Sequence, residues 1–286
     1  MTGPPPATGF VDLHAHSTAS DGTASPADVV RAARKAGVIA LALTDHDTLA
    51  GVAEARVAGE ADGVRVIAGV ELSAVEGEAE VHVLGLHIGA CDDMERRLLT
   101  FQDARRARAE RIVEVLHGLG VMVTLDRVLS IAGSGAVGRP HVAKALIAEG
   151  WVRDFRDAFD RYLGAGRPAY VPKQKLSVAD AVQMIHDTGG LAFMAHPGAD
   201  GTRARVEALA AVGMDGVEVR HPGHTAEDTA RLGTLVEHFG MVPTGGSDWH
   251  GAGEGPRMIG VMRVPYSWLE RQESRLRERT VAGAPT

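Results

Sequence analysis

The chain has 286 residues, of which 45% are apolar, 23% are charged and 4% are aromatic, a composition typical of a globular protein with an aliphatic core. The length suits one large domain or two small ones, and a net charge of −7 does not favour a nucleic-acid-binding surface spread over the whole molecule. The one cysteine, Cys91, excludes an intrachain disulfide and a cysteine-ligated zinc site.

The ends of the chain carry no targeting or membrane signal. The first nine residues have neither a positive n-region nor an apolar h-region, so no signal peptide is expected. No apolar run approaches the ~20 residues that cross a bilayer. We therefore expect a cytoplasmic protein without membrane association, whose residues 1–9 and 277–286 are flexible.

Short apolar runs alternate with helical patterns in the first part of the chain. Residues 10–16 predict a strand, and residues 25–37 predict a helix with a Ser N-cap, a Pro in its first turn and a Gly stop. Further strands are predicted at 38–47, 64–74 and 79–88, with a helix over 49–63. This alternation is typical of parallel βαβ units.

The pattern changes over residues 99–165, which contain a long, Arg-rich amphipathic helix and further helices without a clear strand. We interpret this stretch as a helical insertion. The alternation then resumes, with strands predicted at 191–198, 214–223 and 241–251. The prediction is an α/β barrel of about seven strands, built from residues 10–98 and 166–270 and interrupted by the insertion.

His, Asp and Glu recur where the predicted strands end. In a parallel barrel the carboxyl ends of the strands converge on one face, which is where active sites lie. A single His at a strand end is usually structural, so the argument depends on the recurrence in six segments. The residues are His14, His16, Asp21, His46, Glu71, His82, His196, Asp248 and His250.

Imidazole and carboxylate ligands are accepted by Zn, Mn and Fe, and carboxylates also suit Mg. Nine ligands exceed the roughly four to six that one ion takes, so two or three divalent ions are expected, with Glu71 as a bridge. Three such ions, less the charges of Asp21, Glu71 and Asp248, leave about three positive charges, which suits a phosphate dianion. A metal-bound water is acidified to a pKa of about 7 and supplies hydroxide near neutral pH.

Seven motifs resemble those of the polymerase and histidinol phosphatase (PHP) superfamily: HAHSTASDG, TDHD, GVELS, VHVLGL, GRPH, AHPG and GSDWH. The insertion and the segment FDRYLGAGRPAYV are similar to the branch of stand-alone 3′,5′-nucleoside bisphosphate phosphatases and 5′-3′ exoribonucleases. The resemblance extends over about residues 10–255. It implies a distorted, TIM-like (β/α)7 barrel with a helical insertion and a trinuclear metal site.

The resemblance also implies how the ligands divide. The first metal is assigned to His14, His16, Glu71 and Asp248, the second to Glu71, His82 and His196, and the third to Asp21, His46 and His250. Mn²⁺ is favoured, with Fe²⁺, Zn²⁺ or Mg²⁺ as alternatives. No ligand position of the motif pattern is missing in this sequence.

Arg139 and His141, in GRPH, lie within the insertion before a helix. They form either a capping loop with a solvated Arg or, as the resemblance favours, a phosphate clamp, because Arg binds phosphate oxygens bidentately. The residues expected to bind substrate are Arg106, Arg139, His141, Asp47 and His224. The residues expected to act in catalysis are Asp21, His46, His196 and Arg139.

The predicted function is hydrolysis of a phosphate ester by metal-bound hydroxide, with the 3′-phosphate of a nucleoside 3′,5′-bisphosphate such as pAp as the favoured target. The nearest alternative is a 5′-3′ exoribonuclease acting on short 5′-phosphorylated RNA, followed by a histidinol-phosphate phosphatase. A catalytically silent PHP binding module is the non-enzymatic alternative, against which the complete ligand set argues. The expected partner is thus a phosphorylated small molecule, a nucleotide, or a short RNA.

Overall fold

The computed structural model describes residues 9–77, 79–133, 137–172, 176–251 and 255–282. The chain divides into two compact units. The barrel unit comprises Met1–Glu95 and Leu176–Thr286, and the insertion unit comprises Arg96–Lys175. The insertion unit thus begins before residue 99 and ends after residue 165, the limits expected from the sequence.

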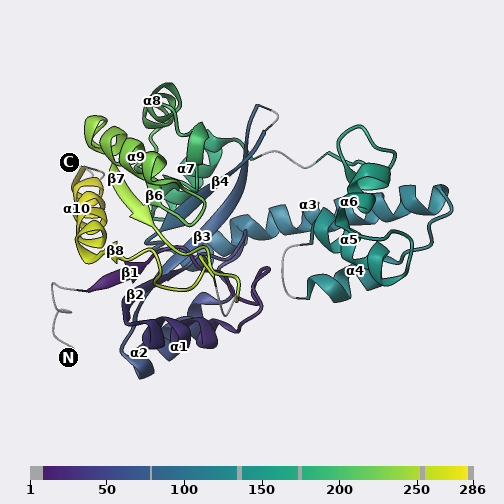
Figure 1. The fold of residues 1–286 in the computed structure, drawn as a ribbon, viewed down its shortest axis with the longest axis horizontal. Helices are drawn as coiled ribbons and strands as arrows, with labels where there is room; N and C mark the ends of the chain where they lie inside the picture. The colour runs from purple at the N-terminus through teal and green to yellow at the C-terminus, as the bar shows by residue number, and fades with distance from the viewer. Residues whose placement is uncertain (1–8, 78, 134–136, 173–175, 252–254, 283–286) are drawn as a thin grey trace. The chain divides into compact units, whose positions relative to one another are not determined.

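The barrel unit contains an eight-stranded sheet in the order β7-β6-β5-β4-β3-β2-β1-β8 (Figure 1). The strands are β1 (Phe10–Asp12), β2 (Val38–Leu43), β3 (Arg65–Glu76), β4 (Ala79–Leu86), β5 (Leu191–Met194), β6 (Gly216–Arg220), β7 (Val242–Gly245) and β8 (Val264–Pro265). β1, β2 and β3 pair in parallel, as do β5, β6 and β7. β4 is antiparallel to both of its neighbours.

The sheet nearly closes into a barrel where the chain beyond β1 meets the chain beyond β7. The N–H of Leu13 donates to the carbonyl of Gly245 (3.1 Å), and Ala15 and Trp249 form a parallel bridge. The buried carboxylate of Asp12 accepts hydrogen bonds from the backbone N–H groups of Ser247 (2.9 Å) and Gly260 (2.8 Å). This seam confirms the predicted distorted α/β barrel.

Three features of the barrel unit differ from the prediction. The sheet has an eighth strand, β8, whose two residues pair antiparallel with β1 and are too few to show a periodic pattern. β3 continues past Glu71, where an end was expected, because its second half pairs with the antiparallel β4. The third concerns residues 277–282, which were expected to be flexible and instead belong to helix α10 (Tyr266–Ala282).

Contacts along α10 explain why it continues. Arg275 donates to the carbonyl of Gly240, and Arg279 pairs with the buried Asp215 (Nη1–Oδ1 3.1 Å). These contacts tie the last turns of the helix to the ends of other elements of the barrel unit. Residues 1–8 and 283–286, the remainder of the expected flexible ends, lie outside the described residues.

The other helices of the barrel unit pack around the sheet with α10 (Figure 1). They are α1 (Pro26–Ala36), α2 (Val52–Asp62), α7 (Val178–Asp187), α8 (Arg203–Ala211) and α9 (Ala226–His238). Four of them begin at a hydroxyl residue whose side chain accepts a hydrogen bond from a backbone N–H of the first turn, at Ser25, Ser177, Thr202 and Thr225. Such caps satisfy donors that a helix start leaves unpaired, which fixes where each helix begins.

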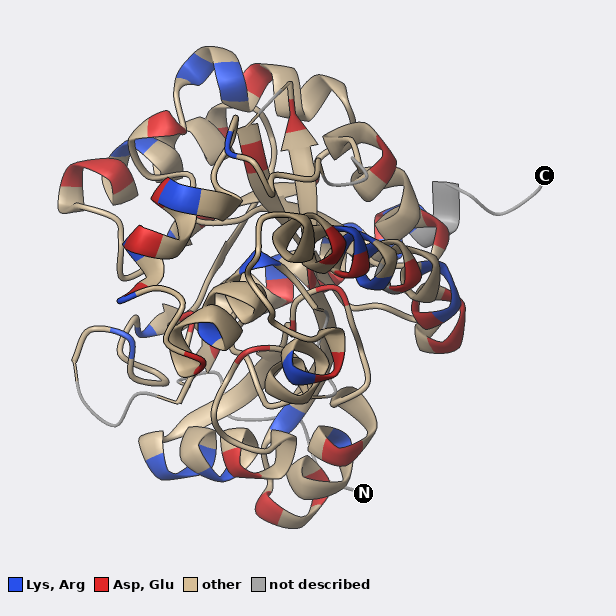
Figure 2. Cartoon of the chain, turned by 90° about the vertical axis from the view of Figure 1, so that its right-hand side faces the viewer, with Lys and Arg blue, Asp and Glu red and all other residues tan. Residues whose placement is uncertain are grey.

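The insertion unit is helical, and no strand occurs among its described residues. Its elements are α3 (Cys91–Gly118), which starts in the barrel unit, α4 (Leu125–Ala132), α5 (Arg139–Ala148), α6 (Phe155–Ala158) and the π-helical turn η1 (Phe159–Leu163). Aliphatic side chains such as Leu116, Val142 and Leu146 form its own core. Acidic and basic residues are interspersed along the helices of the protein (Figure 2). Among the described residues, no helix is both long and apolar enough to cross a membrane.

Gly246 lies at this seam, so replacing it tests whether the seam closes the barrel. A Cβ at this position would lie 2.4 Å from the backbone nitrogen of His14 and 2.8 Å from Oδ1 of Asp12. Because these atoms are held on both sides of the seam, we expect Gly246→Ala to destabilise the fold by about 1–3 kcal/mol, measured as a lower midpoint of thermal unfolding. Gly233→Ala in α9 is the control, because its Cβ would have 3.9 Å of clearance and should be neutral or stabilising. An unchanged midpoint for Gly246→Ala would contradict the proposed closure.

Candidate metal centre

The structure brings all nine expected ligands into one cluster in the barrel unit, with donor atoms of neighbouring residues separated by 2.8–3.9 Å. Most of them follow a strand, as expected: His14, His16 and Asp21 after β1, His46 after β2, His196 after β5, and Asp248 and His250 after β7. Two do not. Glu71 lies within β3, and His82 lies near the amino end of β4, which reaches the cluster because β4 runs antiparallel.

The first group surrounds one carboxylate oxygen of Glu71, a residue that is 1% exposed. Glu71 Oε2 lies 3.1 Å from Nε2 of both His14 and His16. Asp248 Oδ1 lies 3.4 and 3.3 Å from the same two nitrogens. Two imidazoles and two carboxylates therefore converge on one point.

The second group faces the other oxygen of the same carboxylate. Glu71 Oε1 lies 2.8 Å from His82 Nδ1 and 3.0 Å from His196 Nε2, and these two nitrogens are 3.3 Å apart. His46 Nδ1 is also close to Glu71, 3.4 Å from Oε2, so this imidazole borders both groups. Glu71 thus has the geometry of a bridging carboxylate.

The third group gathers around Asp21, which is 41% exposed. Asp21 Oδ1 lies 3.3 Å from His250 Nε2, and Oδ2 lies 3.8 Å from His46 Nε2. His16 presents its second nitrogen, Nδ1, to the same carboxylate at 3.9 Å. This is the most open part of the cluster.

The donor atoms fit bound cations. Ligands about 2.1 Å from an ion and at right angles to each other are about 3.0 Å apart, which is close to the separations within the first two groups. Nδ1 of His16 is buried and has no hydrogen-bond partner, an arrangement that a protein usually avoids unless something else meets that atom. Imidazole nitrogens with carboxylate oxygens form a donor set that Mn, Fe and Zn accept.

The charges of the cluster are strongly coupled. Burial lowers the pKa of His16, but hydrogen bonds with Asp248 and Glu71 outweigh burial and raise this pKa to about 9. Burial raises the pKa of Glu71, but the facing imidazoles, above all His14, hold it well below its usual range. Burial, together with repulsion from His16, lowers the pKa of His46 to about 4, despite the attraction of Glu71. Protonated imidazoles therefore balance the buried carboxylates when no cation does.

Two buried residues that the sequence analysis missed orient the ligands. Glu218, in β6, accepts from Nδ1–H of His14 at 3.0 Å, which leaves Nε2 of His14 directed at the first group. His221 Nδ1 accepts from the N–H of Gly223, so Nε2–H can donate to Asp248 Oδ2 at 3.3 Å. The strand-end position of His221 in GVEVRHPG was a signal for that residue, whereas Glu218 lies inside the strand.

Asp248 has a second partner on the same oxygen. Arg257 Nη1 pairs with Oδ2, the oxygen that also faces His221. With Oδ2 held from that side, Oδ1 remains directed at His14 and His16. Arg257 was not predicted from the sequence either, because this residue does not directly follow a strand and belongs to none of the motifs.

Two residues expected to bind substrate, Asp47 and His224, make hydrogen bonds within the barrel unit. Asp47 is 4% exposed, and its two oxygens accept from the N–H and Oγ–H of Ser73, both at 2.9 Å. His224 donates from Nδ1 to the carbonyl of Val219 and accepts at Nε2 from the N–H of Gly198. These contacts fix the orientation of both side chains, and the contact of Asp47 and His224 with substrate stays a prediction.

The remaining expected substrate residues belong to the insertion unit. Arg139 is the first residue of α5, and its guanidinium lies over the rings of Phe159 and Tyr170, 5.6 and 5.5 Å from their centroids. Its Nη1 donates to the carbonyl of Leu163 at 3.2 Å. His141 accepts at Nδ1 from the N–H of Gly138, and Arg106 is exposed on α3.

Comparisons with known proteins agree with this site. The PHP domain family matches residues 12–118. A 3′,5′-nucleoside bisphosphate phosphatase of Chromobacterium violaceum is 36% identical over 258 residues, which are 87% of this chain and 90% of the relative. A 5′-3′ exoribonuclease of Haemophilus influenzae is 36% identical over 265 residues, 91% of this chain and 92% of the relative.

A crystal structure from Bifidobacterium adolescentis, provisionally classed as a metal-dependent phosphoesterase, is 33% identical with a TM-score of 0.79, and the match covers 95% of this chain and 98% of that one. The chain belongs to the PHP family of metal-dependent phosphoesterases. It is a hydrolase that acts on phosphate esters, which excludes the silent binding module.

Cation binding should release protons. The pKa values of His14 and His16 are raised, that of His16 to about 9, so the His16 imidazole carries a proton at pH 8 in the cation-free protein. An ordinary imidazole, with a pKa near 6.5, is already neutral there. Because an imidazole must be neutral to bind a metal, Mn²⁺ titrated into EDTA-treated protein should displace this proton.

Calorimetry in Tris and in HEPES at pH 8 measures the release as a difference in heat between the two buffers. His117→Gln, on α3 and outside the cluster, should leave the difference unchanged. Equal heats in the two buffers would show that His14 and His16 are already neutral.

Proposed function

We propose that the protein is a phosphomonoesterase that removes the 3′-phosphate of a nucleoside 3′,5′-bisphosphate such as pAp. The observation that carries the proposal is Glu71, whose two oxygens face separate sets of imidazoles. Two cations sharing one carboxylate suit the in-line displacement at phosphorus that two-metal sites perform. The bisphosphate phosphatase of C. violaceum, similar over most of both chains, supports this substrate.

The proposed centre holds three divalent ions, with Mn²⁺ favoured. The ligand sets are His14, His16, Glu71 and Asp248 for the first, Glu71, His82 and His196 for the second, and Asp21, His46 and His250 for the third. Bound ions would supply positive charge for the phosphate oxygens and acidify a water that becomes the nucleophile. The three donor groups around Glu71 and Asp21 support this number.

The proposed role of each ligand residue follows from how deeply its side chain is buried. His14, His16 and Glu71, at most 1% exposed, form the fixed base of the centre. Glu218 and His221 hold His14 and Asp248 in the orientation that directs Nε2 and Oδ1 inward. The more exposed residues reach the side from which substrate enters.

These exposed members are the proposed catalytic residues of the barrel unit. The side chains of His46, His196 and Asp21 are 23%, 31% and 41% exposed. Their nitrogens and oxygens can therefore contact both the centre and a bound phosphate.

Arg139 is proposed as the catalytic and substrate-binding Arg of the insertion unit, with His141 and Arg106 as further contacts. The rings of Phe159 and Tyr170 and the carbonyl of Leu163 preorganise its guanidinium. A planar guanidinium held in one orientation loses little freedom when it binds phosphate. This arrangement supports a phosphate clamp rather than a freely solvated Arg.

The second candidate is a 5′-3′ exoribonuclease, which the relative from H. influenzae favours. The 5′ end of a phosphorylated RNA presents two neighbouring phosphates joined through a ribose, as a bisphosphate nucleotide does. The same centre could therefore perform either hydrolysis. A cytoplasmic location remains a prediction from the sequence for both candidates.

A substrate panel separates these activities. Protein loaded with Mn²⁺ should release phosphate from pAp with a higher kcat/KM than it cleaves short 5′-phosphorylated RNA or histidinol phosphate. EDTA should abolish every activity, and mass spectrometry of the loaded protein should find three ions per chain. Faster cleavage of RNA would establish the exoribonuclease, and faster turnover of histidinol phosphate would overturn both nucleotide proposals.

Arg139→Ala tests the clamp. We expect KM for pAp to rise about tenfold or more, because a charge-assisted hydrogen bond to phosphate is lost, while KM for a simple aryl phosphate changes less. Arg156→Ala, in the same unit and 91% exposed, should alter neither value. Equal increases for the two substrates would remove the clamp.

A further inference from the structure

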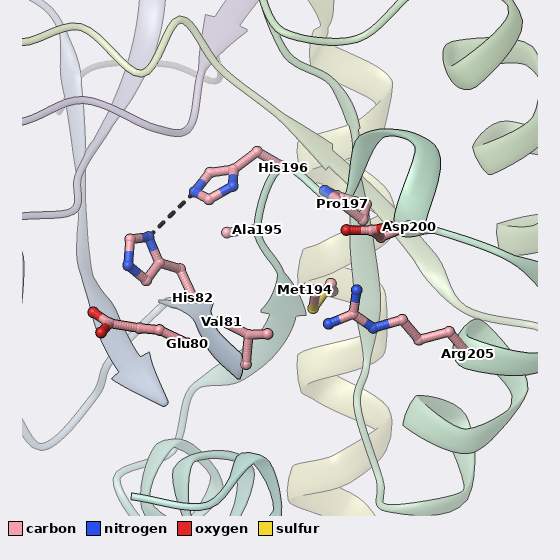
Figure 3. Close-up of a pocket in the computed structure, with 9 residues that line it drawn as sticks. All are labelled: Glu80, Val81, His82, Met194, Ala195, His196, Pro197, Asp200 and Arg205. Carbon is pink, nitrogen blue, oxygen red and sulfur yellow. Dashed lines mark hydrogen bonds between the residues drawn. The ribbon is translucent and has the colours of Figure 1, made fainter. Parts of the chain in front are cut away.

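A cavity of about 150 Å³ lies beside His82 and His196 in the barrel unit (Figure 3). One wall carries Asp200, at the end of the turn η2 (Gly198–Asp200), and Arg205 in α8, while Glu80 in β4 lies across the cavity beside His82 (Figure 3). Sites that hold a drug-sized ligand measure about 300–1,000 Å³. This cavity is therefore large enough for one part of a nucleotide whose phosphate lies at the candidate metal centre.

Arg205, which lines the cavity, has one hydrogen-bond donor without a partner. Its Nη2 pairs with Glu76 Oε2 at 2.6 Å, whereas its Nε is buried and has no hydrogen-bond partner. A buried N–H without an acceptor is costly, so such a group usually marks a missing partner. In Figure 3 the Arg205 guanidinium and the Asp200 carboxylate lie on one side of the view, and the His82 and His196 rings lie on the other.

The charge of the wall argues against a second phosphate here. The carboxylate of Asp200 accompanies the Arg205 guanidinium, which already pairs with a second carboxylate, Glu76, so this wall has more negative than positive charges. A phosphate dianion would be repelled by this excess of negative charge. A hydroxyl is complementary, because its hydrogen can be donated to a carboxylate while its oxygen accepts from an N–H. Carboxylates bind ribose hydroxyls in this way in dinucleotide sites.

We infer that this cavity binds the ribose next to the scissile phosphate, with Asp200 accepting from the 2′-hydroxyl and Arg205 Nε donating to the same oxygen. In a 3′-phosphate ester the 2′-hydroxyl is on the carbon adjacent to the ester, so a phosphate near His82 and His196 brings it to this wall. Asp200 and Arg205 are then specificity-determining residues that favour ribonucleotides over 2′-deoxynucleotides. The inference rests on the proposed nucleotide phosphatase function.

The test compares pAp with its 2′-deoxy analogue in the Mn²⁺-loaded protein. Loss of one hydrogen bond should raise KM about tenfold for the deoxy substrate. Asp200→Ala and Arg205→Lys should raise KM for pAp about tenfold, leave the deoxy KM within about twofold and leave kcat unchanged. Arg205→Lys retains the positive charge beside Glu76 but lacks Nε. The Kd values of the products AMP and 2′-deoxy-AMP should show the same difference.

Controls separate failure of this inference from failure of the proposed function. Glu207→Ala, exposed on the same helix as Arg205, should keep the preference for ribose, and the metal content of every variant should equal that of the wild type. Equal KM for both substrates in the wild type, or equal increases in the variants, overturns the ribose site and leaves the phosphatase intact.

Hydrolysis of an aryl phosphate but of neither nucleotide overturns both proposals. A preference for histidinol phosphate that Asp200→Ala removes assigns the carboxylate to an ammonium group and overturns the ribose site. If the Arg205→Lys protein loses its metal or does not fold, two results still decide whether the cavity binds ribose. They are the effect of Asp200→Ala and the comparison of pAp with its deoxy analogue in the wild type.

Discussion

The buried carboxylate of Glu71 is the constraint on which the rest of the site depends. An ionised carboxylate away from water is costly unless opposite charges and hydrogen-bond donors surround it. Four imidazoles from three separate segments do so, because nitrogens of His14, His16, His82 and His196 lie 2.8–3.1 Å from its oxygens. The antiparallel pairing of β4 with β3 places His82 beside Glu71.

The acids next to the ligands position backbone rather than bind a cation. Asp12 joins the loop of Ser247 to the strand that carries His14, and Asp45 accepts from both N–H and Oγ–H of Ser17, at 2.7 and 2.8 Å. Some ligand positions are also strained. His196 and Asp248 have φ values of 29° and 51°, in the left-handed region that non-glycine residues seldom adopt. The surrounding hydrogen bonds keep these residues in conformations that direct their side chains at the cluster, a common use of strain at active sites.

The sequence was sufficient for the elements with strong periodicity and clear caps, and for the identity of the clustered residues. Helix α1 follows directly from Ser25, Pro26 and Gly37, because each has a conformational preference suited to one end of a helix. The antiparallel direction of β4 was not predicted, although only four residues separate the predicted strands 64–74 and 79–88, too few for the crossover that joins parallel strands.

The role of Glu218 could not be predicted from the sequence alone. A Glu inside an apolar strand shows its role only when its partner is known, and His14 is distant in the sequence. Asp47, next to a ligand in the sequence, likewise has a partner that the sequence did not indicate, Ser73. The local sequence pattern thus identifies candidate ligand and catalytic residues, whereas tertiary contacts determine the partner of each residue.

A centre of this kind provides chemistry without much selectivity. Positive charge and an activated water act on any accessible phosphate ester, so the choice of substrate must come from groups that contact the rest of the molecule. The barrel unit supplies one such set in Asp200 and Arg205, whose mixed charges fit a hydroxyl and disfavour a phosphate. Arg139, in the insertion unit, is the cation proposed to bind a phosphate. Within the barrel unit by itself, a phosphate ester of ribose is the simplest molecule that satisfies both the centre and the pair of Asp200 and Arg205.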